Sequence, residues 1–343
     1  MNRQVIIKST GLHHPDKSVD NEFFVEHFAE WDETLGKRVE GLLAHTGRSR
    51  RYLCTDPNET VLTMAKAAAL PALESAGLSA TDIDGIVFST DTPEYLVPSN
   101  ACMLREILGA TNAHVLYDVN ANCAGMVVAT DVARAQMQAN KRLKRVLVAG
   151  VALLQRCGVN SNAITYATLG DAACAVILEV VEGNEDNPAG IIDSVSETDT
   201  EFIQSILYPK CGLTKANLPG TAGSEKHFIW EAFDTTNAEN CASRMITQVL
   251  TDNGHTIDDV AKVFLTQFSN ASRRAVSSIS GIPLEKFEYV GDVYGYTGTS
   301  SVFLAYHHAV ADKKLTPGDL VVFCGVGAGL LISAMLYKEA NSR

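Results

Sequence analysis

The stretch Asp118-Val-Asn-Ala-Asn-Cys-Ala-Gly125 is followed by a helical pattern and then by Val146-Leu-Val-Ala-Gly150. The same order returns in Asp292-Val-Tyr-Gly-Tyr-Thr-Gly-Thr299, which is again followed by a helical pattern and then by Leu320-Val-Val-Phe-Cys-Gly325. From the aspartate to the final glycine there are 32 positions in the first copy (150 − 118) and 33 in the second (325 − 292). Spacing this similar indicates an internal duplication of one unit.

Around these copies, short apolar runs typical of buried strands alternate with helical patterns. The first long helix, for example, has Asn58 or Thr60 as its N-cap and ends at Gly77. Alternation of strands and helices indicates an α/β fold. We expect strands over 5–7, 86–90, 115–119, 145–149, 263–266, 287–290 and 320–324, and helices over 60–76, 100–108, 125–140, 269–280 and 299–311.

The duplication divides the chain into an N-terminal half, residues 1–180, and a C-terminal half, residues 236–343. Between them, residues 182–188 and 218–224 have the composition of turns and loops. We therefore expect residues 181–235 to connect the two halves and to cover part of them.

Composition excludes several classes of protein. The 343 residues are 46% hydrophobic and 20% charged, unlike disordered, collagen-like or coiled-coil proteins. The net charge of −12 argues against general nucleic-acid binding and against an anionic membrane surface. The uncharged stretch 320–337 is long enough for a membrane span, but glycines interrupt it, so two strands around a turn are expected. We expect a cytoplasmic chain, because the N-terminus has no apolar run typical of a secretory signal.

Cys123 differs from the other seven cysteines in its position. The eight form no C-x-x-C pair and none lies at zinc-ligand spacing from a histidine, so we expect no disulfide scaffold and no structural zinc site. Cys123 follows a strand and precedes the helix that begins near Gly125, where free N–H groups and the helix dipole favour the reactive thiolate. The alternative is a small buried hydrophobic residue, as most free cysteines are.

Motifs spread over nearly the whole chain resemble those of one family, the ketoacyl-acyl-carrier-protein synthase III branch of the thiolase superfamily. The resemblance implies a duplicated five-layer αβαβα sandwich of the α/β class, normally a dimer. The motifs are Thr46-Gly-Arg-Ser-Arg-Arg-Tyr52, Pro57-Asn-Glu-Thr60, Asn122-Cys-Ala-Gly125, Leu169-Gly-Asp-Ala-Ala-Cys-Ala175 and Gly325-Val-Gly-Ala-Gly329.

The resemblance also implies a chemistry, that of an acyltransferase. Cys123 is the residue that accepts an acyl group from a thioester of CoA or of an acyl carrier protein. Backbone N–H groups of Cys123 and Ala328 hold the thioester oxygen, a role that tolerates the alanine in place of the family's glycine. No metal and no cofactor beyond the thioester substrate is implied.

Two residues depart from the family pattern. The family's His is replaced by Gln267 and its Asn by Tyr296, in a register anchored on Asn270 and Gly295. In the family these two residues stabilise the enolate formed when a malonyl thioester decarboxylates, and the His assists proton transfer. Gln267 and Tyr296 offer two hydrogen-bond donors but no base at neutral pH. We therefore expect acyl loading of Cys123 to survive better than decarboxylative condensation, because the helix dipole activates the thiolate without the His.

The residues expected to bind the donor also depart from the family. Its CoA-binding Trp and Arg correspond here to Gly41 and His45, and a later Arg to Asn162, so the donor is a carrier protein or a differently bound CoA.

Other residues are assigned to the donor and to the acyl chain. Arg48, Arg50 and Arg51 form a basic cluster that is expected to contact a phosphopantetheine or an acidic carrier. Val97-Pro98 and residues 202–207 are expected to line an acyl pocket, and Asn270 is assigned with them to substrate binding.

Three hypotheses of function follow. The leading one is a divergent acyltransferase, in fatty-acid-like or specialised metabolism, that passes an acyl group from Cys123 to a carbon, alcohol or amine acceptor. The second is a non-catalytic subunit that pairs with an active homologue. This subunit would form a heterodimer, whereas the acyltransferase of the first hypothesis is expected to form a homodimer. The third is ordinary decarboxylative condensation by an altered triad.

Overall fold

The computed structural model describes residues 3–182 and 189–340, which contain two large β-sheets. The first sheet has the order β1-β7-β6-β4-β5, in which β4 runs parallel to β5 and β6 while β7 runs antiparallel to β6 and β1. Its strands are β1 (Arg3–His13), β4 (Gly85–Ser89), β5 (Val115–Val119), β6 (Arg145–Val151) and β7 (Ala173–Glu182).

The second sheet repeats this pattern of pairing. Its order is β11-β12-β13-β8, with β11 parallel to β12 and the other neighbours antiparallel. A single bridge from Phe287 to Val263 takes the place that β5 has beside β4, so the strand predicted over 287–290 is reduced to one pair of residues. The strands are β8 (Gly190–Thr198), β11 (Val260–Leu265), β12 (Leu320–Gly327) and β13 (Leu331–Lys338).

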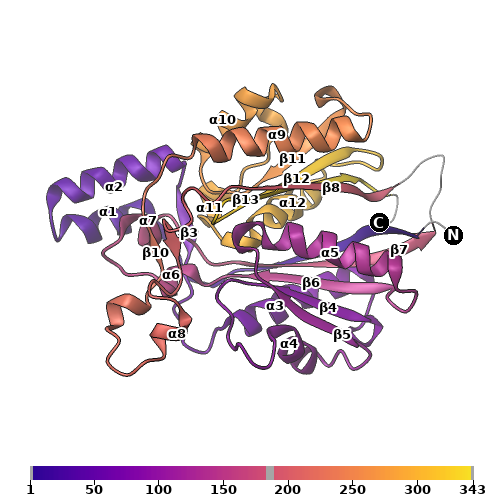
Figure 1. The fold of residues 1–343 in the computed structure, drawn as a ribbon, viewed down its shortest axis with the longest axis horizontal. Helices are drawn as coiled ribbons and strands as arrows, with labels where there is room; N and C mark the ends of the chain where they lie inside the picture. Colours follow the sequence, from indigo (N-terminus) through magenta and orange to yellow (C-terminus); the bar gives the residue numbers. More distant parts are fainter. Residues whose placement is uncertain (1–2, 183–188, 341–343) are drawn as a thin grey trace.

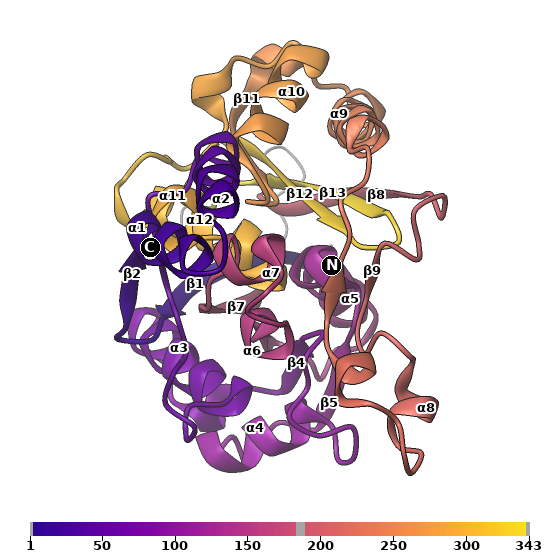
Figure 2. The same cartoon turned by 90° about the vertical axis from the view of Figure 1, so that its left-hand side faces the viewer.

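Helices lie between the sheets and on their outer faces (Figures 1 and 2). α5 (Gly125–Ala139) and α12 (Ser301–Ala311) form the central layer and share one apolar core with strands of both sheets. α3 (Val61–Ala76) and α4 (Asn100–Leu108) cover the first sheet. α9 (Thr236–Asp252) and α10 (Asn270–Ser280) lie on the outer side of the second. The predicted α/β fold, a duplicated five-layer αβαβα sandwich, is confirmed.

Local signals place the helix ends where the sequence predicts them. Thr60 and Thr63 form a capping box at the start of α3, and Gly77 ends the helix at a φ of 67°. Ser269 caps α10 by accepting a hydrogen bond from the Ser272 N–H. Such side chains satisfy N–H groups that have no partner within the helix.

Smaller elements flank the sandwich, and among them α1, α2, α6, α7 and α8 lie at its left-hand end in Figure 1. They comprise a two-stranded ribbon at each side, short helices and 3₁₀ turns. They are β2 (Ser18–Asp20), β3 (Arg50–Tyr52), β9 (Ile206–Leu207), β10 (Ile229–Trp230), α1 (Asn21–Ala29), α2 (Glu33–Thr46), α6 (Leu154–Cys157), α7 (Ala163–Ala167), α8 (Leu213–Ala216), α11 (Gly291–Tyr294), η1 (Ala80–Asp82), η2 (Asn122–Ala124), η3 (Gly223–Lys226), η4 (Ile257–Asp259), η5 (Leu284–Lys286) and η6 (Gly298–Ser300).

The region between the halves differs in part from the expectation. β8 falls inside the range 181–235, yet it is the edge strand of the second sheet because it pairs with β13. Most of the loop expected over 182–188 lies outside the described residues. The apolar stretch 320–337 folds as the expected two strands, β12 and β13. Among the described helices, none has the length and apolar content to cross a bilayer.

Candidate active site

Cys123 lies in the turn between β5 and α5. The turn begins with Asn122 in the left-handed region, at a φ of 50°, and Asn is one of the few side chains that tolerate this conformation. Gly125 opens α5 so close to other segments that a Cβ there would lie 2.3 Å from Ser89 Oγ and 2.7 Å from Thr299 Oγ1. The small residues around Cys123 therefore let the two halves of the chain pack together at the nucleophile.

The thiol of Cys123 is enclosed by hydrogen-bond donors. The Tyr296 hydroxyl and the backbone N–H groups of Cys123 and Ala328 lie near enough to Sγ to lower the pKa of the thiol by hydrogen bonding. The pKa of Cys123 is raised to about 12, because burial, together with the charge of Asp91, outweighs the lowering by hydrogen bonding to Tyr296 and the two backbone N–H groups. Burial therefore outweighs the stabilisation of the thiolate that the helix N-terminus is expected to provide, and the thiol is protonated at neutral pH in the resting protein.

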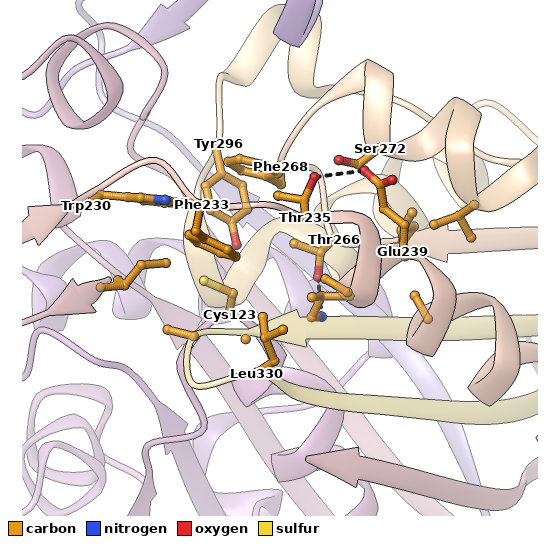
Figure 3. Close-up of a pocket in the computed structure, with 18 residues that line it drawn as sticks. Cys123, Trp230, Phe233, Thr235, Glu239, Thr266, Phe268, Ser272, Tyr296 and Leu330 are labelled. Carbon is orange, nitrogen blue, oxygen red and sulfur yellow. Dashed lines mark hydrogen bonds between the residues drawn. The ribbon is translucent and has the colours of Figure 1, made fainter. Parts of the chain in front are cut away.

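An apolar cavity of about 70 Å³ opens beside the thiol (Figure 3). Three aromatic side chains form one wall: Trp230 stacks on Phe268 with ring centroids 5.1 Å apart, and Tyr296 stands edge-on to both. The opposite wall is mostly aliphatic, from β11, α9, α10 and the β12–β13 turn, with residues such as Ala238, Leu265, Val276 and Leu330. Thr235, Glu239 and Ser272 add polar groups to it, and the Thr235 hydroxyl donates to the Glu239 carboxylate at 3.2 Å. The predominantly apolar lining suits an uncharged ligand segment that ends at Cys123.

A second cavity meets the first at Cys123. Trp230, Ile206 and Ala328 line both, so the nucleophile lies where the two join. The second cavity is more polar because Asp91, Asn120, Asn122 and Tyr208 contribute to its wall. Of the segment 202–207 that was expected to line an acyl pocket, Ile206 does so.

Gln267 does not point into either cavity. Its amide Nε2 donates to the carbonyl oxygens of Leu265, at 2.6 Å, and Glu288, at 3.2 Å, and its Oε1 accepts from the Val290 N–H at 2.9 Å. The side chain is 2% exposed and is wholly used in joining backbone segments. The prediction that Gln267 faces the acceptor is therefore wrong.

Thr266 occupies the place predicted for Gln267. Thr266 lines the apolar cavity, and its Oγ1 accepts a hydrogen bond from the Val326 N–H at 2.8 Å. The sequence register was anchored on Asn270, which lies outside both cavities and accepts from Arg273 Nε at 3.0 Å. Ser269, not Asn270, is the N-cap of α10, so a register anchored on this cap moves the predicted position by one residue, from Gln267 to Thr266.

Two of the three arginines in the predicted basic cluster, Arg48 and Arg51, are buried, and only Arg50 is exposed. Arg48 is 4% exposed and donates to the carbonyl oxygens of Gln267, Phe268, Thr168 and Gly291. It thereby holds the segment that carries Phe268 against the cavity.

Arg51 and Val97 are placed differently from their predicted roles. Arg51 is fully buried, lies 3.9 Å from the ring centroid of Phe24 and donates to Asn21 Oδ1 at 2.7 Å. Val97 is 87% exposed and lines neither cavity. Neither Arg51 nor Val97 of this chain therefore lines either of the two cavities that meet at Cys123.

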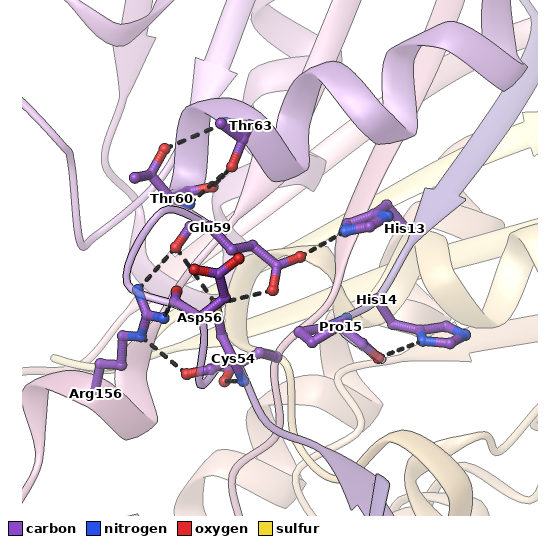
Figure 4. A network of polar contacts seen from close by, with 10 residues as sticks. His13, His14, Pro15, Cys54, Asp56, Glu59, Thr60, Thr63 and Arg156 are labelled. Atoms are coloured by element: carbon purple, nitrogen blue, oxygen red, sulfur yellow. Dashed lines mark hydrogen bonds and ion pairs between the residues drawn. The ribbon is translucent and has the colours of Figure 1, made fainter. Parts of the chain in front are cut away.

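Arg156 joins α6 to the loop before α3 (Figure 4). Its guanidinium donates to the carbonyl oxygens of Cys54, Asp56 and Glu59. Because α6 also carries Leu154, which lines the second cavity, this clamp positions one wall of the site. Cys54 in the same network donates to the Glu59 carboxylate at 3.2 Å, and burial raises the pKa of its thiol, so it is a structural residue.

Comparisons with known proteins identify a family of similar sequences. Residues 117–200 match the family model described as 3-oxoacyl-[acyl-carrier-protein (ACP)] synthase III, and residues 250–338 match the model of its C-terminal part. A beta-ketoacyl-[acyl-carrier-protein] synthase III of Rhodobacter capsulatus is 31% identical, over 98% of this chain and 100% of the relative.

Solved structures share the fold over almost their whole length. The 3-oxoacyl-[acyl-carrier-protein] synthase III of Aquifex aeolicus superposes with a TM-score of 0.82 at 24% identity, covering 98% of this chain and 99% of the other. The corresponding protein of Pseudomonas aeruginosa gives a TM-score of 0.86 at 21% identity, covering 99% of each chain.

Proposed function

Because this chain belongs to the 3-oxoacyl-[acyl-carrier-protein] synthase III family, we propose that it transfers acyl groups through a thioester on Cys123. The observation that carries the proposal is the position of the thiol, which lies where two cavities join, beside the Tyr296 hydroxyl and the backbone N–H groups of Cys123 and Ala328. The donor is a thioester of CoA or of an acyl carrier protein, the carrier named in the descriptions of the relatives. The protein acts as a homodimer in the cytoplasm.

The first step is a thiol–thioester exchange. Cys123 Sγ attacks the thioester carbon, the new carbon–sulfur bond forms, and the bond to the donor's sulfur breaks. The thiol proton of Cys123 ends on the departing donor thiol, so no other reactant is consumed. The N–H groups of Cys123 and Ala328 stabilise the negative oxygen of the tetrahedral intermediate, and the Tyr296 hydroxyl stabilises charge on the attacking sulfur.

The second step delivers the acyl group to an acceptor without help from an imidazole. Among the described residues that line the two cavities, none is a histidine. Thr266 and Tyr296 offer hydroxyl groups, which donate hydrogen bonds but accept no proton at neutral pH. We therefore assign to this protein acyl transfer to a carbon, alcohol or amine nucleophile, with decarboxylation of a malonyl thioester slow or absent.

Intact-protein mass spectrometry after incubation with acyl-CoA and acyl-carrier donors tests the proposal. Wild-type protein should gain the mass of the acyl group, and Cys123→Ala should not. Cys102→Ala is the matched control, because Cys102 is exposed and distant from the cavities, and it should load normally. If no donor adds an acyl mass, or if Cys123→Ala still acquires it, the proposal fails and the non-catalytic subunit becomes the better hypothesis.

A further inference from the structure

Asp91 is a carboxylate inside the reaction space that the chemistry above does not use. It follows β4 by two residues and lines the second cavity together with Cys123. The opposite walls of that cavity come from α6, through Leu154, and from the β9–β10 region, through Tyr208 and Phe228. The carboxylate is close enough to the nucleophile for its charge to raise the pKa of the Cys123 thiol.

One oxygen of Asp91 lacks a hydrogen-bond partner in the described part of the chain. Oδ1 is buried and accepts no hydrogen bond from the protein. Asp118, on the neighbouring strand β5, provides a contrast, because it accepts from the N–H groups of Asn100 and Ala101 and from Asn100 Nδ2, all at 2.7–2.8 Å. Both oxygens of Asp118, which serves the fold, are thus paired, whereas Asp91 beside Cys123 keeps one oxygen open to the cavity.

The open oxygen has an energetic consequence. A buried acceptor without a donor is costly, and an unpaired charge more so. Burial raises the pKa of Asp91 to about 6, so the carboxylate is still largely ionised at pH 7.5 and is purely an acceptor. A ligand group that enters this cavity and donates a hydrogen bond to Oδ1 would offset the free-energy cost of burying the carboxylate. An alkyl group would exclude water from the carboxylate without replacing the missing hydrogen bond.

We propose that Asp91 selects the acyl group: it accepts a hydrogen bond from an ammonium or hydroxyl group that the acyl chain carries near its thioester carbonyl. The site then prefers short amino- or hydroxy-substituted acyl thioesters to plain alkyl ones. The inference rests on the proposed acyl loading of Cys123. It assigns the polar cavity to the acyl group and leaves the apolar cavity to the uncharged arm of the thioester.

Three pantetheine thioesters test this selection. Butyryl, 3-hydroxypropionyl and 3-aminopropionyl groups have the same number of non-hydrogen atoms and differ only in the terminal methyl, hydroxyl or ammonium group. The rate of mass gain at Cys123 is measured for each at pH 7.5. Wild-type protein should load the hydroxy and amino compounds at least ~10-fold faster than butyryl, because only the hydroxyl and ammonium groups can donate a hydrogen bond to the Asp91 carboxylate.

Variants of Asp91 separate selection from general damage. Asp91→Asn should lose the preference for the ammonium compound and keep part of that for the hydroxyl compound, because its amide oxygen still accepts. Asp91→Leu should load butyryl best. Asp258→Asn, an exposed change outside both cavities, is the matched control and should keep the wild-type order. Thermal unfolding of each variant identifies any that fails to fold, and the order of the three donors in wild-type protein tests the inference without a variant.

The outcomes distinguish the two proposals. If wild-type protein loads butyryl as fast as the substituted compounds, the selection is wrong while acyl loading stands. If Asp91→Asn slows all three donors equally, Asp91 has a general role and selection is again wrong. If no donor loads Cys123, including CoA and carrier thioesters, the proposed function fails and the inference with it.

Discussion

At Cys123, burial and hydrogen bonding act in opposite directions on one sulfur atom. Burial outweighs the effect of the three donors, so the pKa of the thiol is raised to about 12. The resting protein therefore holds a protonated, protected nucleophile. In the proposed reaction, charge develops on the sulfur only when a thioester is in place. The Tyr296 hydroxyl then stabilises the sulfur, while the N–H groups of Cys123 and Ala328 hold the thioester oxygen.

Removing the Tyr296 hydroxyl should expose this balance. Tyr296→Phe keeps the ring against Trp230 but removes a donor to Sγ, so the pKa of Cys123 should rise. Acyl loading should fall by ~10- to 100-fold. The measurement is the rate of mass gain with one donor.

Alkylation of Cys123 by iodoacetamide, located by peptide mapping, provides a second readout. Below a pKa of about 12 the thiolate fraction rises tenfold per pH unit, so the wild-type rate should climb steadily from pH 7 to 10. Asp91→Asn removes a neighbouring negative charge and should accelerate alkylation at any one pH. A wild-type rate that levels off near pH 8 would contradict the protonated resting state.

Thr266 and Gln267 provide a matched pair of substitutions. Thr266→His places an imidazole in the apolar cavity and should raise the release of CO₂ from a malonyl thioester. Gln267→His should not, because that side chain points away from the cavity and would give up three hydrogen bonds to the backbone. It should also lower the free energy of unfolding by ~1–3 kcal/mol. If Gln267→His releases CO₂ and Thr266→His does not, Gln267 rather than Thr266 takes the place of the family's His, as the alignment anchored on Asn270 predicts.

At the scale of elements, the turn from β5 into α5 is fixed by contacts with distant segments. Gly125 lies against Ser89 at the end of β4 and Thr299 in η6, and Gly325 of β12 approaches Ala124 so closely that a Cβ would lie 2.7 Å from its Cα. Tight approach of backbones leaves no room for a side chain. The nucleophile is thus held by three elements that a sequence pattern treats as separate.

Substitution of two glycines measures this tightness. Gly125→Ala should lower the free energy of unfolding by ~1–3 kcal/mol, because its Cβ overlaps two hydroxyl oxygens. Gly41→Ala, inside α2, is the control: its Cβ meets nothing within 4 Å, so it should stabilise by up to ~1 kcal/mol. Chemical denaturation of both variants checks the pair. If both substitutions changed the free energy of unfolding by the same amount, the backbone around Gly125 would have to shift without cost to make room for the added Cβ.

At the scale of the whole molecule, the site lies where the two copies of the unit meet. Cys123 comes from the first half, while Thr266, Tyr296 and Ala328 come from the second. The copies are tied there by a backbone bridge between Leu169 and Tyr296, the residue whose side chain lies beside the sulfur. Duplication therefore supplies the nucleophile from one copy and its surroundings from the other.

Asp171 gives this junction a dependence on pH. Burial raises its pKa to about 7; Oδ2 accepts from the Cys54 N–H, while Oδ1 has no partner among the described residues. The folded state binds this proton more tightly than the unfolded state, so the free energy of unfolding should fall as pH rises from about 4 to 7 and then level off.

Asp171→Asn should remove this cost of ionisation. At pH 8 it should raise the free energy of unfolding by ~1–4 kcal/mol, while at pH 4 it should change little. Denaturation at several pH values, taken as the difference between variant and wild type, isolates this group from the other titrating residues. A difference that is constant between pH 4 and 8 would contradict the raised pKa.

The sequence by itself determined the duplicated fold, most helix and strand positions and the singular cysteine. These depend on local signals: strand and helix periodicity, caps such as Thr60 and Gly77, and a glycine after the nucleophile. The family resemblance followed from the same motifs. Such signals predict where an element lies, and they predicted the turn that carries Cys123.

Only the tertiary structure decided what surrounds the sulfur. It placed Thr266 rather than Gln267 in the cavity, buried Arg48 and Arg51, and brought Asp91 to the thiol. Each of these depends on how segments far apart in the chain pack, which sets desolvation and hydrogen-bond partners that no local pattern encodes. The raised pKa of Cys123 has the same origin, because a helix N-terminus is visible in the sequence and the depth of its burial is not.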